Sequence, residues 1–165
     1  MTKAVALLLG LGGVAGVCIC LWTYVQLLEA STLFSKAAAL MGTFLFVFGF
    51  SAWTGLQLWK RKPHAYRWAK IVLGLQVPSI TAPGFAYQFY TALTLCPSYN
   101  FTDGKLHFDF EVASAIVFQI SHRIEVISLG LNLIALAALI YIMYASSRPI
   151  PDPKKTPMFQ PQVSQ

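Results

Sequence analysis

The sequence is short of charge, because only 11% of its 165 residues are Asp, Glu, Lys or Arg while 56% are hydrophobic. Charged side chains are also missing from the centres of its long apolar runs. That second absence argues against proton relays and ion pathways, which usually need an ionisable group within the membrane. The composition is typical of a polytopic membrane protein, and the length limits it to one membrane domain.

Motifs that carry chemistry are also missing. The sequence has no CxxC, no glycine-rich phosphate loop and no GxSxG. Its three histidines are scattered without metal-ligand spacing, and its three cysteines do not suggest a disulfide framework. We therefore predict no catalytic residues, no metal site and no cofactor. The surplus of basic residues follows membrane topology, so nucleic acid is not an expected partner.

Four apolar runs come close to the ~20 residues that a helix needs to cross a bilayer. They cover residues 4–28, 37–59, 68–95 and 126–144. The first is longer than the apolar part of a signal peptide and lacks an A-x-A-like cleavage site, so we interpret it as an uncleaved helix. The sequence thus predicts an all-α integral membrane protein with four transmembrane helices in a single domain, residues 1–147.

Basic residues indicate the orientation, because Lys and Arg gather on the cytoplasmic side of short loops. The connection 60–70, KRKPHAYRWAK, is rich in them and is therefore expected in the cytoplasm. An even number of crossings then places both termini there, in a plasma or bacterial inner membrane whose bilayer is the first partner. The proline-rich residues 148–165 are expected to form a disordered cytoplasmic tail.

Glycines in the first two runs indicate close helix contacts. Gly12 and Gly16 have GxxxG spacing, and Gly42 and Gly49 lie one heptad apart on a shared face. Small residues of this kind let another backbone approach closely. Contacts within one chain and contacts between copies are both consistent with the pattern.

The third run contains Pro78 and Pro83. A proline inside a helix cannot donate to the carbonyl four residues earlier, so Pro78 would free that of Gly74 near the bilayer centre. We call the polar surroundings expected there the polar notch. Its residues are Gly74, Gln76, Pro78, Ser79, Thr81 and Asn132. We interpret it as a kink that lets helices pack, with binding of a small polar solute as the functional alternative.

Residues 105–125 show strict alternation of apolar and polar side chains in two arms. Period two with β-branched and aromatic residues predicts strands, and parity favours an odd turn such as Ala113-Ser114-Ala115. We therefore predict an outer β-hairpin between helices three and four, in either of two registers. Its candidate interaction face consists of Leu106, Phe108, Phe110, Ile116, Phe118 and Ile120.

These patterns support three hypotheses for the function. The leading one is a non-catalytic accessory or interaction protein that uses helix faces and the hairpin to hold a membrane-protein partner or a second copy. The alternative is a component that binds or transports a small solute at the polar notch. A third is a membrane enzyme using outer residues such as His107, Asp109 and Glu111.

Overall fold

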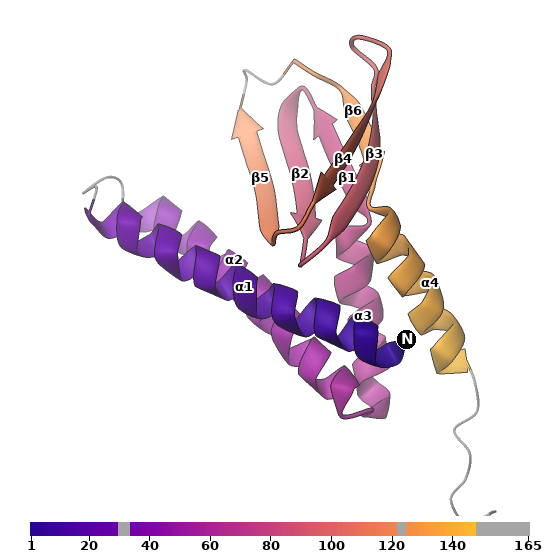
Figure 1. Ribbon diagram of the computed structural model, residues 1–165. Helices are drawn as coiled ribbons and strands as arrows, with labels where there is room; N and C mark the ends of the chain where they lie inside the picture. Colours follow the sequence, from indigo (N-terminus) through magenta and orange to yellow (C-terminus); the bar gives the residue numbers. More distant parts are fainter. Residues whose placement is uncertain (30–33, 122–124, 148–165) are drawn as a thin grey trace, which may run out of the picture.

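The computed structural model describes residues 1–29, 34–121 and 125–147, without the side chains of 27–29, 34–40, 120 and 121. Within these residues the chain forms helices and a six-stranded antiparallel sheet (Figure 1). The elements in chain order are α1 (Thr2–Glu29), α2 (Phe34–Trp59), α3 (Pro63–Gln76), β1 (Pro78–Ala82), β2 (Gly84–Tyr90), β3 (Thr94–Asn100), β4 (Lys105–Glu111), β5 (Ala115–Ser121), β6 (Ser128–Leu131) and α4 (Leu133–Ser147). The prediction of an all-α protein is therefore wrong, and the fold is mixed α/β.

Helices α1 and α2 form a long antiparallel pair (Figure 1). Residues Thr2–Gln26 and Met41–Trp59 are long and apolar enough to cross a membrane. Core helices of soluble proteins and, near an N-terminus, signal sequences have the same length and composition. Two of the four predicted spans thus correspond to helices of suitable length and polarity.

The third predicted span, 68–95, is wrong. Helix α3 ends at Gln76, and β1 begins at Pro78. Pro78 has no N–H to continue the helix, and the residues after it include β-branched and aromatic side chains that favour strands. Pro83 lies in the tight connection between β1 and β2, where Gly84 has a φ of 82°. The two prolines therefore mark a change to sheet and not a kink within a helix.

The fourth predicted span, 126–144, is also wrong. Its first part contains strand β6, and α4 begins only at Leu133. Asn132 separates the two, because its side-chain Oδ1 accepts hydrogen bonds from the N–H groups of Ile134 and Ala135. Such a bond is typical of a residue that caps a helix N-terminus. Helix α4 has 15 residues, about 22 Å at 1.5 Å per residue, which is short of the ~30 Å hydrocarbon core.

The predicted hairpin of 105–125 has the right strands but the wrong pairing. Both arms are strands, β4 and β5, yet the sheet order is β4-β3-β6-β1-β2-β5. The two arms therefore lie at opposite edges, β4 beside β3 and β5 beside β2. The partner of β5, strand β2, lies in the segment predicted as the third helix, whereas the partner of β4, strand β3, lies almost wholly in the link that follows that segment.

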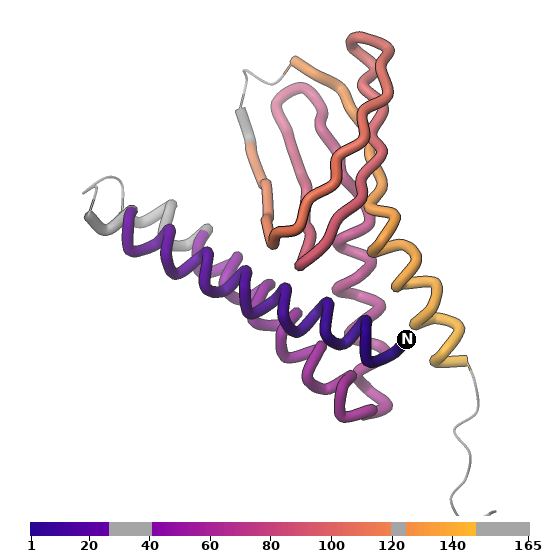
Figure 2. The backbone as a smooth tube through the Cα atoms, viewed as in Figure 1, coloured from indigo at the N-terminus to yellow at the C-terminus, as the bar shows by residue number. Residues whose placement is uncertain are grey.

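The sheet is strongly curled. In a flat sheet the two edges of six strands would be about 24 Å apart at ~4.8 Å per strand. The link from Glu111 in β4 to Ala115 in β5 can span at most about 14 Å. The two edges must therefore approach each other at this end, where Figure 2 shows the chain passing directly from one strand to the other.

The sheet stands at one end of α3 and α4 and over the middle of α1 (Figure 1). Below it, buried small and branched residues pack α3 against α4 and against the start of α1. This core cluster includes Val5, Leu9, Leu58, Ala65, Ala69, Val72, Leu73, Ala138 and Ile142. The short helices α3 and α4 thus pack side by side and connect the sheet to the end of the molecule that contains the basic connection between α2 and α3.

Candidate interaction surfaces

One end of the helical layer collects basic residues. The hydroxyls of Thr2 and Tyr141 hydrogen bond at 2.8 Å, so the start of α1 lies beside α4. The Lys3 ammonium lies 5.3 Å from the centre of the Trp59 ring, a cation–π contact that joins the start of α1 to the end of α2. The basic connection 60–62 continues directly from Trp59. We call this region the basic end.

Glycine allows the backbones of α1 and α2 to meet. A Cβ at Gly55 would clash with the backbone of Gly10, and one at Gly13 would clash with the backbone of Ala52. Gly16 faces the ring of Phe48. Of the predicted contact glycines, Gly12 meets the connection at Ala92 and Gly16 meets α2. A Cβ at Gly42 or Gly49 would meet nothing within 4 Å, so no close contact is found at that predicted pair.

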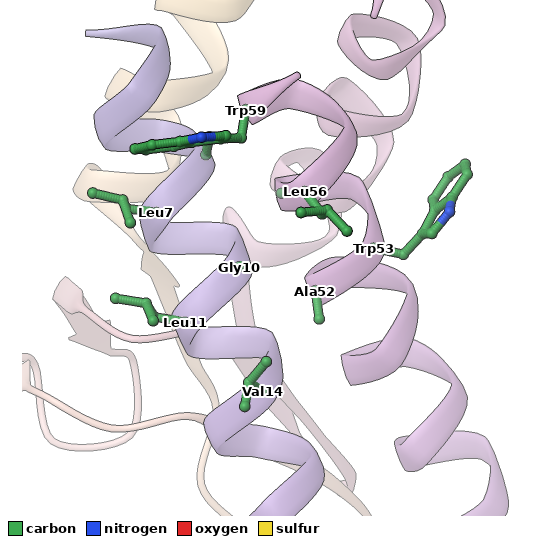
Figure 3. A pocket seen from close by; sticks show the side chains of 10 residues that line it. Leu7, Gly10, Leu11, Val14, Ala52, Trp53, Leu56 and Trp59 are labelled. Carbon is green, nitrogen blue, oxygen red and sulfur yellow. The ribbon is translucent and has the colours of Figure 1, made fainter. Parts of the chain in front are cut away.

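An apolar groove runs along the α1–α2 pair (Figure 3). Its volume is about 570 Å³, and its lining has no charged side chain. Small residues form its floor, and Trp59 reaches toward α1 at one end (Figure 3). The lining residues are Ala6, Leu7, Gly10, Leu11, Val14, Ala52, Trp53, Gly55, Leu56 and Trp59. We call this feature the α1–α2 groove.

Buried polar contacts fix the sheet to α1. The Ser114 hydroxyl donates to the Gly12 carbonyl at 2.7 Å and accepts from the Ala92 N–H at 3.1 Å. A Cβ on Gly12 would lie 2.6 Å from the Ala92 nitrogen, so only glycine permits this approach. Ala92 has a φ of 66°, a left-handed conformation that is unusual for alanine. Two of the short connections of the sheet, 91–93 and 112–114, therefore rest on α1 at Gly12.

Strand pairing separates apolar from polar side chains with few exceptions. Directly paired residues of an antiparallel sheet point to the same face, and one row of pairs crosses all six strands. From β4 to β5 it consists of Leu106, Tyr99, Leu129, Ile80, Tyr87 and Phe118. Alternation places on the same face Pro78, Phe85, Phe89, Leu95, Pro97, Phe108, Phe110, Ile116 and Leu131. We call this the apolar face.

The opposite, polar face is the concave one. It carries Ser79, Thr81, Gln88, Tyr90, Thr94, Cys96, Ser98, Asn100, Lys105, His107, Asp109, Glu111, Gln119 and Ser128, with Val117 as an exception. The Tyr90 hydroxyl on β2 donates to the Glu111 carboxylate on β4, although three strands separate them in the sheet. Burial and this bond raise the pKa of Tyr90 above its ordinary value. Only a curl toward the polar face can bring these side chains together.

For several residues, exposure is the reverse of that in an ordinary one-sided sheet. Phe108 and Phe110 on the apolar face are 68% and 62% exposed, whereas Cys96 on the polar face is 2% exposed. Cys96 fills the space above Gly130, where a Cβ would lie 2.8 Å from its sulfur. Apolar residues are thus turned outward and several polar residues inward. A one-sided sheet in water normally has its apolar face covered.

Residues of the predicted polar notch are only partly brought together. Gln76 is buried at the end of α3, where its Oε1 accepts from the Thr91 hydroxyl at 3.1 Å. The Asn132 N–H donates to the Val77 carbonyl at 2.8 Å, so Asn132 lies near the same helix end. Gly74 is within α3, Pro78 is on the apolar face, and Ser79 and Thr81 are on the polar face.

The predicted interaction face is divided between the two sheet edges. Leu106, Phe108 and Phe110 are exposed on β4, and Phe118 is exposed on β5. Ile116 is half-buried near Phe48 and Phe89, and the side chain of Ile120 lies outside the described residues. These residues still share one face of the sheet. Alternation in FAYQFY and TLCPSYN could have revealed the rest of that face, but hydropathy averaged over a long window concealed it.

The residues named for the enzyme hypothesis do not form a metal site. His107, Asp109 and Glu111 follow one another along the polar side of β4, and all three are exposed. Within the described part of the chain, no three or more His, Cys, Asp or Glu residues are grouped so that they could hold a metal ion.

Comparison with protein-family models, curated proteins and solved structures finds no match for this chain.

Proposed function

We propose that this chain is a non-catalytic interaction protein of a membrane, anchored by α1 and α2, which holds an apolar helix of another membrane protein in the α1–α2 groove. The groove carries the proposal, because its floor of small residues would let a further helix approach closely. Recognition of this kind, a helix laid in an apolar groove, is common in proteins.

Exposure of the two long helices supports a membrane location. Only 39% of the apolar window in Thr2–Gln26 and 28% of that in Met41–Trp59 is buried. In water such large exposed apolar surfaces would promote aggregation, whereas lipid covers them without cost. A soluble core helix of this length would have most of its apolar side chains covered by protein.

The basic end supports an orientation. Lys3, Lys60, Arg61 and Lys62 lie where α1 begins and α2 ends. Because basic residues are retained on the cytoplasmic side, this end and the N-terminus would face the cytoplasm. Helix α4 ends on the same side of the molecule as the start of α1 (Figure 1), so Ser147 would lie on the cytoplasmic side too.

Site-specific photocrosslinking in native membranes tests the groove. A benzophenone-bearing phenylalanine analogue at Leu11, inside the groove, should crosslink to one protein of defined mass. The matched control is the same analogue at Leu21, which is also exposed on α1 but does not line the groove; it should react mainly with lipid. The same products from both positions would contradict the proposal, and a dimer-sized product from position 11 would assign the groove to a second copy.

A second candidate is binding of a small polar solute near the junction of α3, α4 and the sheet. Three polar side chains in that part of the molecule are almost fully buried and keep an atom without a hydrogen-bond partner: Gln76 Nε2, Thr94 Oγ1 and Asn132 Nδ2. Buried polar atoms normally have partners, and a solute could supply them. Uptake of labelled sugars and amino acids into reconstituted vesicles, lost in Gln76→Leu but retained in Gly10→Leu, would favour this function.

A further inference from the structure

The apolar face of the sheet is continuous with the surface of α1 that would contact lipid. Ile19 of α1, which lies outside the α1–α2 groove, lines a shallow apolar cleft together with Val112 and Ala113 of the β4–β5 link. Val112 is 72% exposed, and Phe110 and Phe108 follow it along the outward side of β4. Exposed apolar side chains therefore extend without a polar interruption from the helix onto the sheet.

The contact at Gly12 fixes the depth of the sheet. Gly12 follows Val5 by about 10 Å along α1 at 1.5 Å per residue, and the hydrocarbon core is about 30 Å thick. If the core begins just after Lys3, the Ser114 link that rests on Gly12 lies well inside it. Helix α3, with 14 residues and about 21 Å of length, is also shorter than the core is thick, so the start of β1 would lie within it as well.

The polar turns lie at the other end of the strands. Strand β4 has seven residues and is about 24 Å long, so a strand that begins near the middle of the bilayer and runs along the bilayer normal ends beyond the hydrocarbon. The β3–β4 turn stands at that far end and contains exposed Thr102, Asp103 and Gly104. The apolar end of β4, next to Val112, would thus lie in the hydrocarbon, and the polar β3–β4 turn at its other end would lie in water.

We propose that lipid acyl chains cover the apolar face, so that the curled sheet stands partly within the leaflet opposite the basic end. This inference rests on the membrane placement of α1 and α2 proposed above, but not on the occupant of the α1–α2 groove. The bilayer is the occupant because the apolar face continues the surface of α1 and begins at membrane depth.

The curl also explains how the unpaired backbone groups of the two edge strands could avoid contact with lipid. Lipid offers no hydrogen-bond partners for the N–H and C=O groups of an open sheet edge. The free edges of β4 and β5 approach each other at the deep end, where only residues 112–114 separate them. Between the edges lies the polar face, with the charged side chains of Lys105, Asp109 and Glu111. These groups keep water on the concave side, which hydrates the edges while the convex side faces lipid.

Photocrosslinking in vesicles of phosphatidylcholine and phosphatidylglycerol tests the lipid contact. The full chain would carry the benzophenone analogue at Phe108 or, as the matched control, at His107. These neighbours are both exposed but point to opposite faces of β4. We expect at least a fivefold larger yield of lipid adduct, measured by mass spectrometry, from position 108 than from position 107.

A second pair of positions, on β5, controls for the case in which a substitution on β4 disturbs the folding of that edge. Phe118 and Gln119 on β5 are also exposed neighbours on opposite faces, and position 118 should give the larger lipid adduct. Equal yields within both pairs, or no lipid adduct from 108 and 118, would overturn the inference. A protein adduct in place of a lipid adduct at 108 in native membranes would also overturn it, whatever position 11 reports about the groove.

Discussion

Tyr90 on β2 donates a hydrogen bond to Glu111 on β4, across the three strands that lie between them in the sheet. Tyr90 is almost fully buried, so its hydroxyl has few other partners. The bond stands next to the β4–β5 link, at the end of the sheet where its two edges approach. It therefore joins two strands that share no backbone hydrogen bonds and stabilises the curl.

Removal of this bond should loosen the curl. Tyr90→Phe deletes only the hydroxyl, and a hydrogen bond to a charged group contributes about 1.5–3 kcal/mol; because Glu111 is exposed, we expect about 1 kcal/mol. Thermal unfolding in detergent should show the loss, and hydrogen exchange at residues 112–114 should become faster. Tyr87→Phe is the control. It also deletes one hydroxyl on β2, but the exposed bond that it removes goes to the Leu75 carbonyl of α3 and not to β4. Unchanged exchange in Tyr90→Phe would contradict this role.

Two glycines of α2 should respond oppositely to the same substitution. In Gly55→Ala the new Cβ would meet the Gly10 backbone, so the helices must separate, which costs about 1–3 kcal/mol as overpacking does elsewhere. In Gly49→Ala nothing lies within 4 Å of the new Cβ, and alanine favours a helix over glycine by up to about 1 kcal/mol. Unfolding of the detergent-solubilised variants should rank Gly49→Ala at or above the wild type and Gly55→Ala below it. Equal stabilities would contradict the close α1–α2 packing.

The sequence indicates α1 and α2 directly. Each is one continuous apolar run, and its length alone predicts a helix without any periodic pattern of polar residues. The sequence also indicates β4 and β5, where charged residues such as Asp109 and Glu111 make the alternation of period two visible. In β1–β3 the polar positions carry no charged residue, and several of them hold small, nearly apolar residues such as Ser79, Ala86 and Cys96. A window long enough to find a helix averages over that alternation, so strands were interpreted as part of a helix.

Pairing could not be inferred from β4 and β5 alone. Parity permits the hairpin, and the link 112–114 is short enough for it. Strand β3, which directly precedes β4 in the chain, pairs with it locally. Strands β1 and β2 come from further upstream and β6 from after β5, so long-range contacts determine the rest of the order. The α1–α2 groove has no sequence signal either, because Gly10 and Gly55 resemble the other helix glycines until the register of the two helices is known.

Ser114 should be critical for the attachment of the sheet to α1. Ser114→Ala removes both the donor to Gly12 and the acceptor for Ala92 in a buried place, where an unsatisfied group costs about 1–3 kcal/mol. Denaturant unfolding should show that loss. Ser146→Ala, which removes an exposed bond to Met143 within α4, should change stability by a few tenths of a kcal/mol at most. Equal effects of the two variants would contradict the assignment.

Asn132 should matter through its side-chain oxygen. Asn132→Ala removes the acceptor for the N–H groups of Ile134 and Ala135, and loss of an N-cap residue costs about 1 kcal/mol. Asn132→Ser retains an oxygen and removes the Nδ2 atom, which has no hydrogen-bond partner in the structure. Thermal unfolding should therefore place Asn132→Ser close to the wild type and Asn132→Ala below it. The reverse order would indicate that the amide nitrogen has a role of its own.

Filling the α1–α2 groove should remove the partner without disturbing the fold. A Cβ on Gly10 would meet nothing within 4 Å, and the rest of a leucine side chain would occupy the groove between Leu7 and Leu56. Gly10→Leu should thus keep the thermal stability of the wild type and lose the protein crosslink formed from position 11. Gly42→Leu is the matched control, because Gly42 is equally open but lies outside the groove. If Gly10→Leu retains the crosslink at full yield, the partner does not occupy the groove.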